Sequence, residues 1–209
     1  MAKTKSLIIK NVRCLYPALD APKAFEGQTE EQAKYGIKIL IPKSDKVAVA
    51  AIKEFVNGSI TDHAKWPATV KKQVQKIAFD ADPYVDNAIL KDGDALNTRR
   101  EDEGKEKLSA YAGHYVIGAK RNRKIGPPTV VNAAAQNIPA GLIAGEIQSG
   151  YWINIQLSAY CYDKPKQGIT LSLNAVQLVK TDEVFGAESP FSALEETEFV
   201  DDAAAESIF

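Results

Sequence analysis

The fold is decided by residues 151–162, which read YWINIQLSAYCY, together with residues 168–179, which read GITLSLNAVQLV. Successive side chains of a β-strand point to opposite faces. In the first stretch one face is apolar and consists of Tyr151, Ile153, Ile155, Leu157, Ala159 and Cys161. The other face mixes polar groups with large rings, namely Trp152, Asn154, Gln156, Ser158, Tyr160 and Tyr162. This alternation predicts a strand with one side in a core and the other side exposed.

The second stretch alternates in the same way, with Ile169, Leu171 and Leu173 on its apolar face. Residues 163–167, DKPKQ, suit a turn between the two stretches, so we predict a β-hairpin. Its exposed side carries aromatic rings, amides and hydroxyls. Such rings either pack under a loop or a neighbouring subunit, or bind a ligand, and the pattern leaves both interpretations open.

Shorter patterns predict the remaining elements. Strands are expected at residues 6–16, ended by Pro17, and at 35–41, 114–120 and 129–132. Residues 20–34 and 91–107 read as loops, 137–149 as loops or short elements, and 71–84 are ambiguous. Because strands and helices do not alternate, the order favours a mainly β fold, a small β-barrel with a helix and long loop insertions, over an α/β sheet.

The predicted helix covers residues 45–57, with Ser44 as its N-cap and Gly58 after its end. Val47, Ala51 and Phe55 recur at a spacing of four residues, which indicates a side buried in the core.

Charge is distributed very unevenly along the chain, although the net charge is only −1. Residues 1–180 hold all 26 Lys and Arg but 18 of the 27 Asp and Glu, a balance of +8. Residues 181–209 hold nine acids and no base. We therefore divide the chain into a core, residues 1–182, and an acidic tail, residues 183–209. A basic core suggests a polyanionic partner, and a well-solvated surface is the alternative.

Single-stranded nucleic acid fits the exposed side of the hairpin. Unpaired bases stack on aromatic rings, and cationic side chains neutralise the phosphates. We predict base contacts from Trp152, Tyr160 and Tyr162 and polar contacts from Asn154 and Gln156. The predicted basic rim consists of Lys120, Arg121, Arg123, Lys124, Lys164 and Lys166.

The acidic tail alternates acids with isolated hydrophobic residues and ends in phenylalanine. This composition is typical of an interaction segment without a fixed structure. A terminal ring and an α-carboxylate can enter one pocket of a partner together. The predicted partner-binding residues are Asp201, Asp202, Glu206, Ile208 and Phe209. A purely solubilising tail is the alternative, and it would not require the last two residues.

Several classes of protein lack support in the sequence. It contains no phosphate-binding glycine loop, no nucleophile-elbow motif and no Cys/His metal pattern, so we expect neither an enzyme nor a metal or other cofactor. Asp92-Gly93-Asp94 reads as a turn rather than a nuclease site. No apolar run is long enough for a signal peptide or a membrane span, and Cys14 and Cys161 read as free buried thiols, so a cytoplasmic protein is expected.

Six segments, in this order and spacing, resemble a family of phage single-stranded DNA-binding proteins that was first catalogued as a domain of unknown function. They are residues 12–17 (VRCLYP), 35–43 (YGIKILIPK), 90–94 (LKDGD), 113–115 (GHY), 149–154 (SGYWIN) and 168–177 (GITLSLNAVQ). The resemblance spans residues 12–186. It implies an OB-fold, a five-stranded barrel that commonly binds oligonucleotides.

The resemblance also implies a role in phage DNA replication or recombination, inside an infected bacterial host. It implies a tail that recruits a polymerase, helicase or primase. Two alternatives remain open: a protein that anneals complementary strands, and a phage assembly or decoy protein whose tail mimics DNA. A homodimer is also left open.

Overall fold

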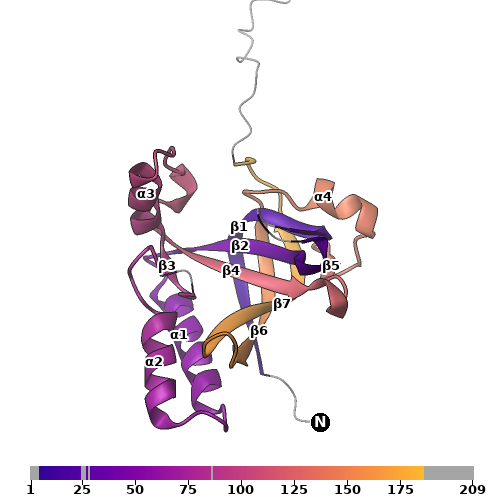
Figure 1. Cartoon of the computed structure of the whole chain (residues 1–209). Helices are drawn as coiled ribbons and strands as arrows, with labels where there is room; N and C mark the ends of the chain where they lie inside the picture. Colours follow the sequence, from indigo (N-terminus) through magenta and orange to yellow (C-terminus); the bar gives the residue numbers. More distant parts are fainter. Residues whose placement is uncertain (1–4, 25–26, 28, 86, 186–209) are drawn as a thin grey trace, which may run out of the picture.

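The computed structural model describes residues 5–24, 27, 29–85 and 87–185, and a β-barrel forms its centre (Figure 1). Its five strands are β1 (Ser6–Lys23), β2 (Lys34–Pro42), β4 (His114–Asn122), β6 (Trp152–Tyr162) and β7 (Gly168–Lys180). β1 pairs antiparallel with β2 and β6, β2 pairs with β4, and β6 pairs with β7. A parallel pairing of β4 with β7 closes the barrel. This connectivity is that of an OB-fold, so the predicted fold class is confirmed.

Shorter elements surround the barrel. Two short strands, β3 (Lys91–Asp92) and β5 (Thr129–Val131), pair with β4 and β7 respectively. Four short helical turns are η1 (Glu30–Gln32), η2 (Ser109–Tyr111), η3 (Arg123–Ile125) and η4 (Ala140–Leu142), and α4 (Ile143–Glu146) follows η4 directly. The predicted strand at 129–132 and the short elements at 137–149 are therefore confirmed.

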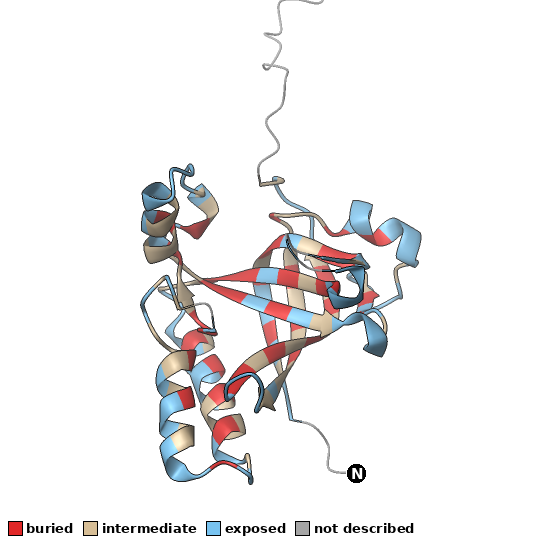
Figure 2. Ribbon diagram, viewed as in Figure 1, coloured by how far each residue is buried: buried red, intermediate tan, exposed pale blue. Residues whose placement is uncertain are grey.

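The barrel core follows the alternation that the hairpin sequence predicts. Ile153, Ile155 and Leu157 of β6 are almost completely buried. Buried and exposed residues alternate along the barrel strands in Figure 2. In β7 the apolar positions change parity after Leu173, because a register shift in the β6–β7 pairing precedes Val176. A bulge of this kind keeps both halves of β7 facing the core.

β1 is longer than predicted, since it continues through Pro17 to Lys23. Pro17 lies where the pairing with β2 shifts register, between Leu15 and Ala18. A proline there removes no ladder hydrogen bond, so it does not end the strand. The predicted loop at 20–34 is correspondingly shorter.

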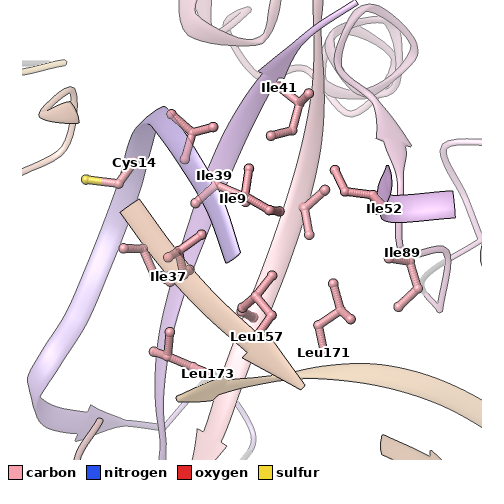
Figure 3. Packing of buried hydrophobic residues seen from close by; sticks show 14 of the residues in the cluster. Ile9, Cys14, Ile37, Ile39, Ile41, Ile52, Ile89, Leu157, Leu171 and Leu173 are labelled. Carbon is pink, nitrogen blue, oxygen red and sulfur yellow. The ribbon is translucent and has the colours of Figure 1, made fainter. Parts of the chain in front are cut away.

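The predicted helix is present but longer and rotated. α1 spans Lys46–Thr61, is capped by Asp45 rather than Ser44, and passes through Gly58. Its buried residues are Val49, Ile52, Val56 and Ile60. The predicted buried side was wrong, because Val47 is 81% exposed and Ala51 is exposed. The ambiguous segment forms α2, Ala68–Ala78, which packs on α1 (Figure 1). Ile52 and Ile89, both from the segment between β2 and β4, belong to the core cluster of the barrel in Figure 3.

The predicted loop at 91–107 was wrong, because most of it is helical. α3 spans Gly93–Asp102, and the Asp92 carboxylate caps it by accepting hydrogen bonds from the backbone N–H groups of Asp94 and Ala95. Gly93 is required here, since a Cβ at this position would collide with the carbonyl oxygen of Tyr111. Capping and close packing thus make a helix from a sequence with little apolar periodicity.

None of the helices in the described ranges is both long and apolar enough to span a membrane. The structure contains Cys14 and Cys161 as free thiols. Burial raises the pKa of the Cys14 thiol to about 12.

Candidate nucleic-acid interface

The outer side of β2 and β4 carries lysines separated by glycines. Even-numbered residues of both strands lie on the side away from the barrel core, where Lys38 pairs with Gly118 and Lys120 pairs with Gly36. Leu40 and Val116 lie on the same side but are buried in a second, smaller hydrophobic cluster. Burial, and then the nearby charges of Lys34 and Lys38, lower the pKa of Lys120 below the ordinary lysine value. This surface therefore gathers positive charge that a polyanion would stabilise.

A cavity of about 370 Å³ opens on this surface, and we call it the basic cleft. Its volume lies within the range of about 300–1,000 Å³ that is usual for ligand sites. Strand residues line it from below and α3 lines it from one side, through Lys38, Lys91, Val116, Gly118, Lys120, Ile169, Thr170, Leu96, Arg99 and Arg100. Among the described residues that line it, Glu103 is the one acid, and hydrogen bonds from Lys105 and Arg99 lower the pKa of Glu103 to about 2. The cleft is thus predominantly cationic.

Two tyrosines complete the basic cleft. The hydroxyl of Tyr111 accepts a hydrogen bond of 3.0 Å from Lys38 Nζ, which also lies 5.2 Å from the centre of the Tyr16 ring. The Tyr162 ring lies across Gly168 on the neighbouring strand and lines the cleft from the hairpin end. Tyr160 pairs with Thr170 and is 60% exposed, so it lies one strand outside the cleft on the same surface.

In the structure, the predicted site residues on β6 lie in two separate places. Tyr162 lines the cleft and Tyr160 lies beside it, whereas Trp152 lies eight residues from Tyr160 along the strand, roughly 26 Å at about 3.3 Å per residue. Asn154 donates a hydrogen bond of 2.9 Å to Gln177, and Gln156 donates one of 3.3 Å to Ser6. The polar side chains of this outer surface are therefore engaged with their neighbours.

The residues of the predicted basic rim also lie in separate places. Lys120 lines the basic cleft. Arg121 has the opposite strand parity and donates hydrogen bonds to the carbonyl oxygens of Gly126 and Leu173. Arg123 donates to the carbonyl oxygen of Glu30, and Lys124 is exposed in η3. Lys164 and Lys166 are exposed in the β6–β7 turn, where Trp66 Nε1 donates a hydrogen bond of 2.6 Å to Asp163.

The segment after β7 crosses the far end of β6. Trp152 Nε1 donates a hydrogen bond of 2.6 Å to Asp182, and this bond is the main cause of the lowered pKa of that carboxyl. The Arg13 guanidinium lies 4.0 Å from the centre of the Phe185 ring and donates a hydrogen bond to the carbonyl oxygen of Glu183. Residues 183–185 of the predicted tail thus contact the barrel. The predicted tail residues Asp201, Asp202, Glu206, Ile208 and Phe209 lie outside the described residues.

Several cleft residues were missed from the sequence, above all Tyr111 and the α3 arginines Arg99 and Arg100. No local pattern marks them, because the two arginines fall in the predicted loop at 91–107 and Tyr111 lies between that loop and the next predicted strand. Lys38 lies in the predicted strand at 35–41, to which no functional role was assigned. The spacing of Lys34, Gly36 and Lys38 on that side was the available signal.

The carboxylates that could suggest catalysis have structural partners. Lys43 Nζ forms ion pairs of 2.6 Å with both Asp92 and Asp94. In the described ranges, no cluster of three or more His, Cys, Asp or Glu side chains is arranged to bind a metal ion.

The basic, aromatic cleft lies on the second and third strands of the barrel, which is the face that OB-folds commonly use to bind oligonucleotides. The chain belongs to the family described as Enterobacter phage Enc34, ssDNA-binding protein, whose sequence model matches residues 5–208. No curated protein matches the chain.

Solved structures share this fold. The single-stranded DNA-binding protein from bacteriophage Enc34 in complex with ssDNA is 24% identical, with a TM-score of 0.60 over 87% of this chain and 89% of that chain. A C-terminal truncation of the Enc34 protein is 25% identical, with a TM-score of 0.62 over 86% and 88% of the two chains. The gp2.5 protein, a single-stranded DNA-binding protein encoded by bacteriophage T7, is 14% identical, with a TM-score of 0.51 over 94% and 98%.

Proposed function

We propose that this protein is a non-catalytic single-stranded DNA-binding protein that acts in phage DNA replication or recombination, in the cytoplasm of the infected host. The basic cleft carries this proposal, because it combines five cationic side chains with two tyrosines on the barrel surface. Family membership and the Enc34 structure with ssDNA support it.

In the proposed mode of binding, phosphates lie near Lys38, Lys120 and Arg100, and bases stack on Tyr160 and Tyr162. Aromatic stacking tolerates any base, and phosphate contacts carry no sequence information. Lys164 and Lys166 extend the cationic path along the β6–β7 turn, and Arg123 and Lys124 extend it beyond β4. The bound strand is therefore expected to be held without a strong sequence preference.

The outer surface of β6 is a second candidate surface for DNA. The hydrogen bond between Trp152 and Asp182 supports this proposal, because an acidic group already occupies the surface there. DNA that reaches Trp152, Asn154 and Gln156 has to compete with an acid at the root of the predicted tail. The remaining acids follow on the same tether, at a high effective concentration near the basic core. We propose that the tail competes with DNA, and that its displacement exposes Asp201, Asp202, Glu206, Ile208 and Phe209 to a replication partner such as a polymerase, helicase or primase.

The test is a titration of labelled single-stranded and double-stranded oligonucleotides with the full-length protein, with and without Mg²⁺. Single strands should bind more tightly, and Lys38→Gln/Lys120→Gln should weaken that binding. The same variant should make the salt dependence shallower by about 0.7 for each phosphate that the protein no longer neutralises. Lys46→Gln/Lys53→Gln on α1 is the matched control, since it removes the same charge away from the cleft.

The other outcomes of this titration identify the alternatives. Cleavage of DNA would indicate a nuclease, and absence of binding would indicate the decoy alternative. Faster pairing of complementary strands would indicate an annealing protein.

A further inference from the structure

Gly118 is a glycine that the backbone of β4 does not need. It lies within the strand and its φ is not in the left-handed region. A Cβ built on it would have no atom within 4 Å, so no neighbour excludes a side chain. Glycine weakens a strand interior, and it often marks a place where a ligand approaches the backbone closely. The role of Gly118 therefore concerns the open space above its backbone.

That space is the floor of the basic cleft. Lys38 is the direct partner of Gly118 on β2, and Lys120 follows two residues later on the same side of β4. Thr170 lies on the same side of β7, since Ser172 pairs with Lys120 and alternate residues share a face. Any side chain at position 118 would project into the cavity next to both lysines. The glycine leaves a flat strip of bare peptide there instead.

A second glycine fixes the ring beside this strip. A Cβ at Gly168 would collide with the Tyr162 ring, which rests on the bare backbone of β7. This contact places the Tyr162 ring over β7, and all three of Tyr162, Thr170 and Gly118 line the cavity. The cleft thus has a flat floor, an aromatic wall and two cations adjacent to the floor.

We propose that Gly118 is the floor of a seat for one nucleobase, which lies against the backbone of β4 beside the Tyr162 ring while Lys38 and Lys120 hold the flanking phosphates. This inference rests on the proposed function. It adds a contact at Gly118 whose binding energy comes from the base and not from the phosphate. A planar, weakly polar group of the size of a base fits a bare peptide strip, whereas a phosphate would gain nothing from the missing side chain.

The experiment compares Gly118→Ala and Gly118→Val with the wild type on two oligonucleotides of equal length, an oligothymidylate and one with abasic sugars throughout. Both variants should keep or raise the melting temperature, because a Cβ has room and a strand favours valine. Affinity for oligothymidylate should fall, more for valine, by roughly 5- to 150-fold, which corresponds to the stacking of one base. Affinity for the abasic strand should hardly change. Gly58→Ala in α1, also with open space around its Cβ, is the matched control and should not alter binding.

Equal losses on both oligonucleotides, or no loss on either, would overturn the base seat. Lys38→Gln/Lys120→Gln separates this failure from that of the proposed function, since it should weaken binding to both strands whether or not the seat exists. Tyr162→Phe, which keeps the ring, should retain the preference for oligothymidylate, and Tyr162→Ser should reduce it. Loss of the preference in both would also contradict the proposal.

Discussion

The two outer surfaces of the barrel, that of β2 and β4 and that of β6, are both polar but differ in what their polar groups contact. On β6, Asn154 bonds to Gln177, Gln156 to Ser6, and Ser158 accepts a hydrogen bond of 2.6 Å from Asn174. On β2 and β4, burial and then the nearby charges of Lys34 and Lys38 lower the pKa of Lys120. Side chains that satisfy one another stabilise the barrel without a ligand, whereas gathered like charges are stabilised by a polyanion.

The largest expected effect concerns the stability of β6 rather than DNA binding. Leu157→Ala should lower the free energy of unfolding by about 2–5 kcal/mol, because Leu157 is fully buried in the core. Gln156→Ala, one residue earlier on the outer surface, should cost no more than about 1 kcal/mol. Chemical denaturation of the two variants measures the difference. Similar losses would show that the outer surface of β6 belongs to a buried interface.

The next effect separates the two surfaces by their affinity for single-stranded DNA. Tyr162→Ala at the basic cleft should cost about 1–3 kcal/mol of binding free energy, as for the loss of one stacked base. Trp152→Ala should cost less at low salt, because Asp182 has to leave the indole before DNA can reach it. Fluorescence anisotropy titrations compare the two. A larger loss for Trp152→Ala would make β6, as the sequence alone predicts, the main binding surface.

The fold was largely predictable because the β6–β7 hairpin carries its alternation in contiguous residues. α3 was not, since its helical form depends on the Asp92 cap and on the fit of Gly93 under Tyr111, neither of which is a periodic signal. The buried side of α1 was missed for a different reason. Val47 and Val49 each begin an apolar stripe, and only packing on the barrel decides between the two stripes.

The site was predictable only in part. Tyr162 could be proposed from strand parity and Lys120 from the basic cluster at residues 120–124, because both signals are local. The basic cleft itself joins residues from β2, α3, η2, β4 and β7, and no sequence spacing connects Lys38 to Thr170. Their proximity follows from the parallel closure of β4 on β7, which only the folded chain reveals.

A smaller effect is expected from the tail. Deleting residues 188–209 removes seven of the nine acids that follow residue 180. Attraction between the tail and the basic core weakens beyond about 8–10 Å in physiological salt. The deletion should therefore tighten single-stranded DNA binding severalfold at low salt and little at high salt. Removing only Phe209 should leave DNA affinity unchanged and reduce partner binding. If the deletion leaves low-salt affinity unchanged, the tail is only a tether.

The smallest effect is a pH dependence that belongs to the cleft surface alone. The pKa of Lys120 is lowered in the free protein by burial and by Lys34 and Lys38, and a bound phosphate should raise it again, because it favours the charged lysine. Binding strength should thus be constant at neutral pH and should fall as the pH rises through the lowered pKa, below the ordinary lysine value of about 10.4. Lys120→Arg keeps its charge throughout this range, so its affinity should fall less.

The measurement uses an oligoadenylate, whose bases do not ionise there, and Lys46→Arg on α1 as the control with the wild-type profile. Because one lysine exchanges at most one proton, the two profiles can diverge by no more than about one logarithmic unit of affinity per pH unit. Parallel profiles for the wild type and Lys120→Arg would mean that DNA does not approach Lys120, and the comparison would then favour β6.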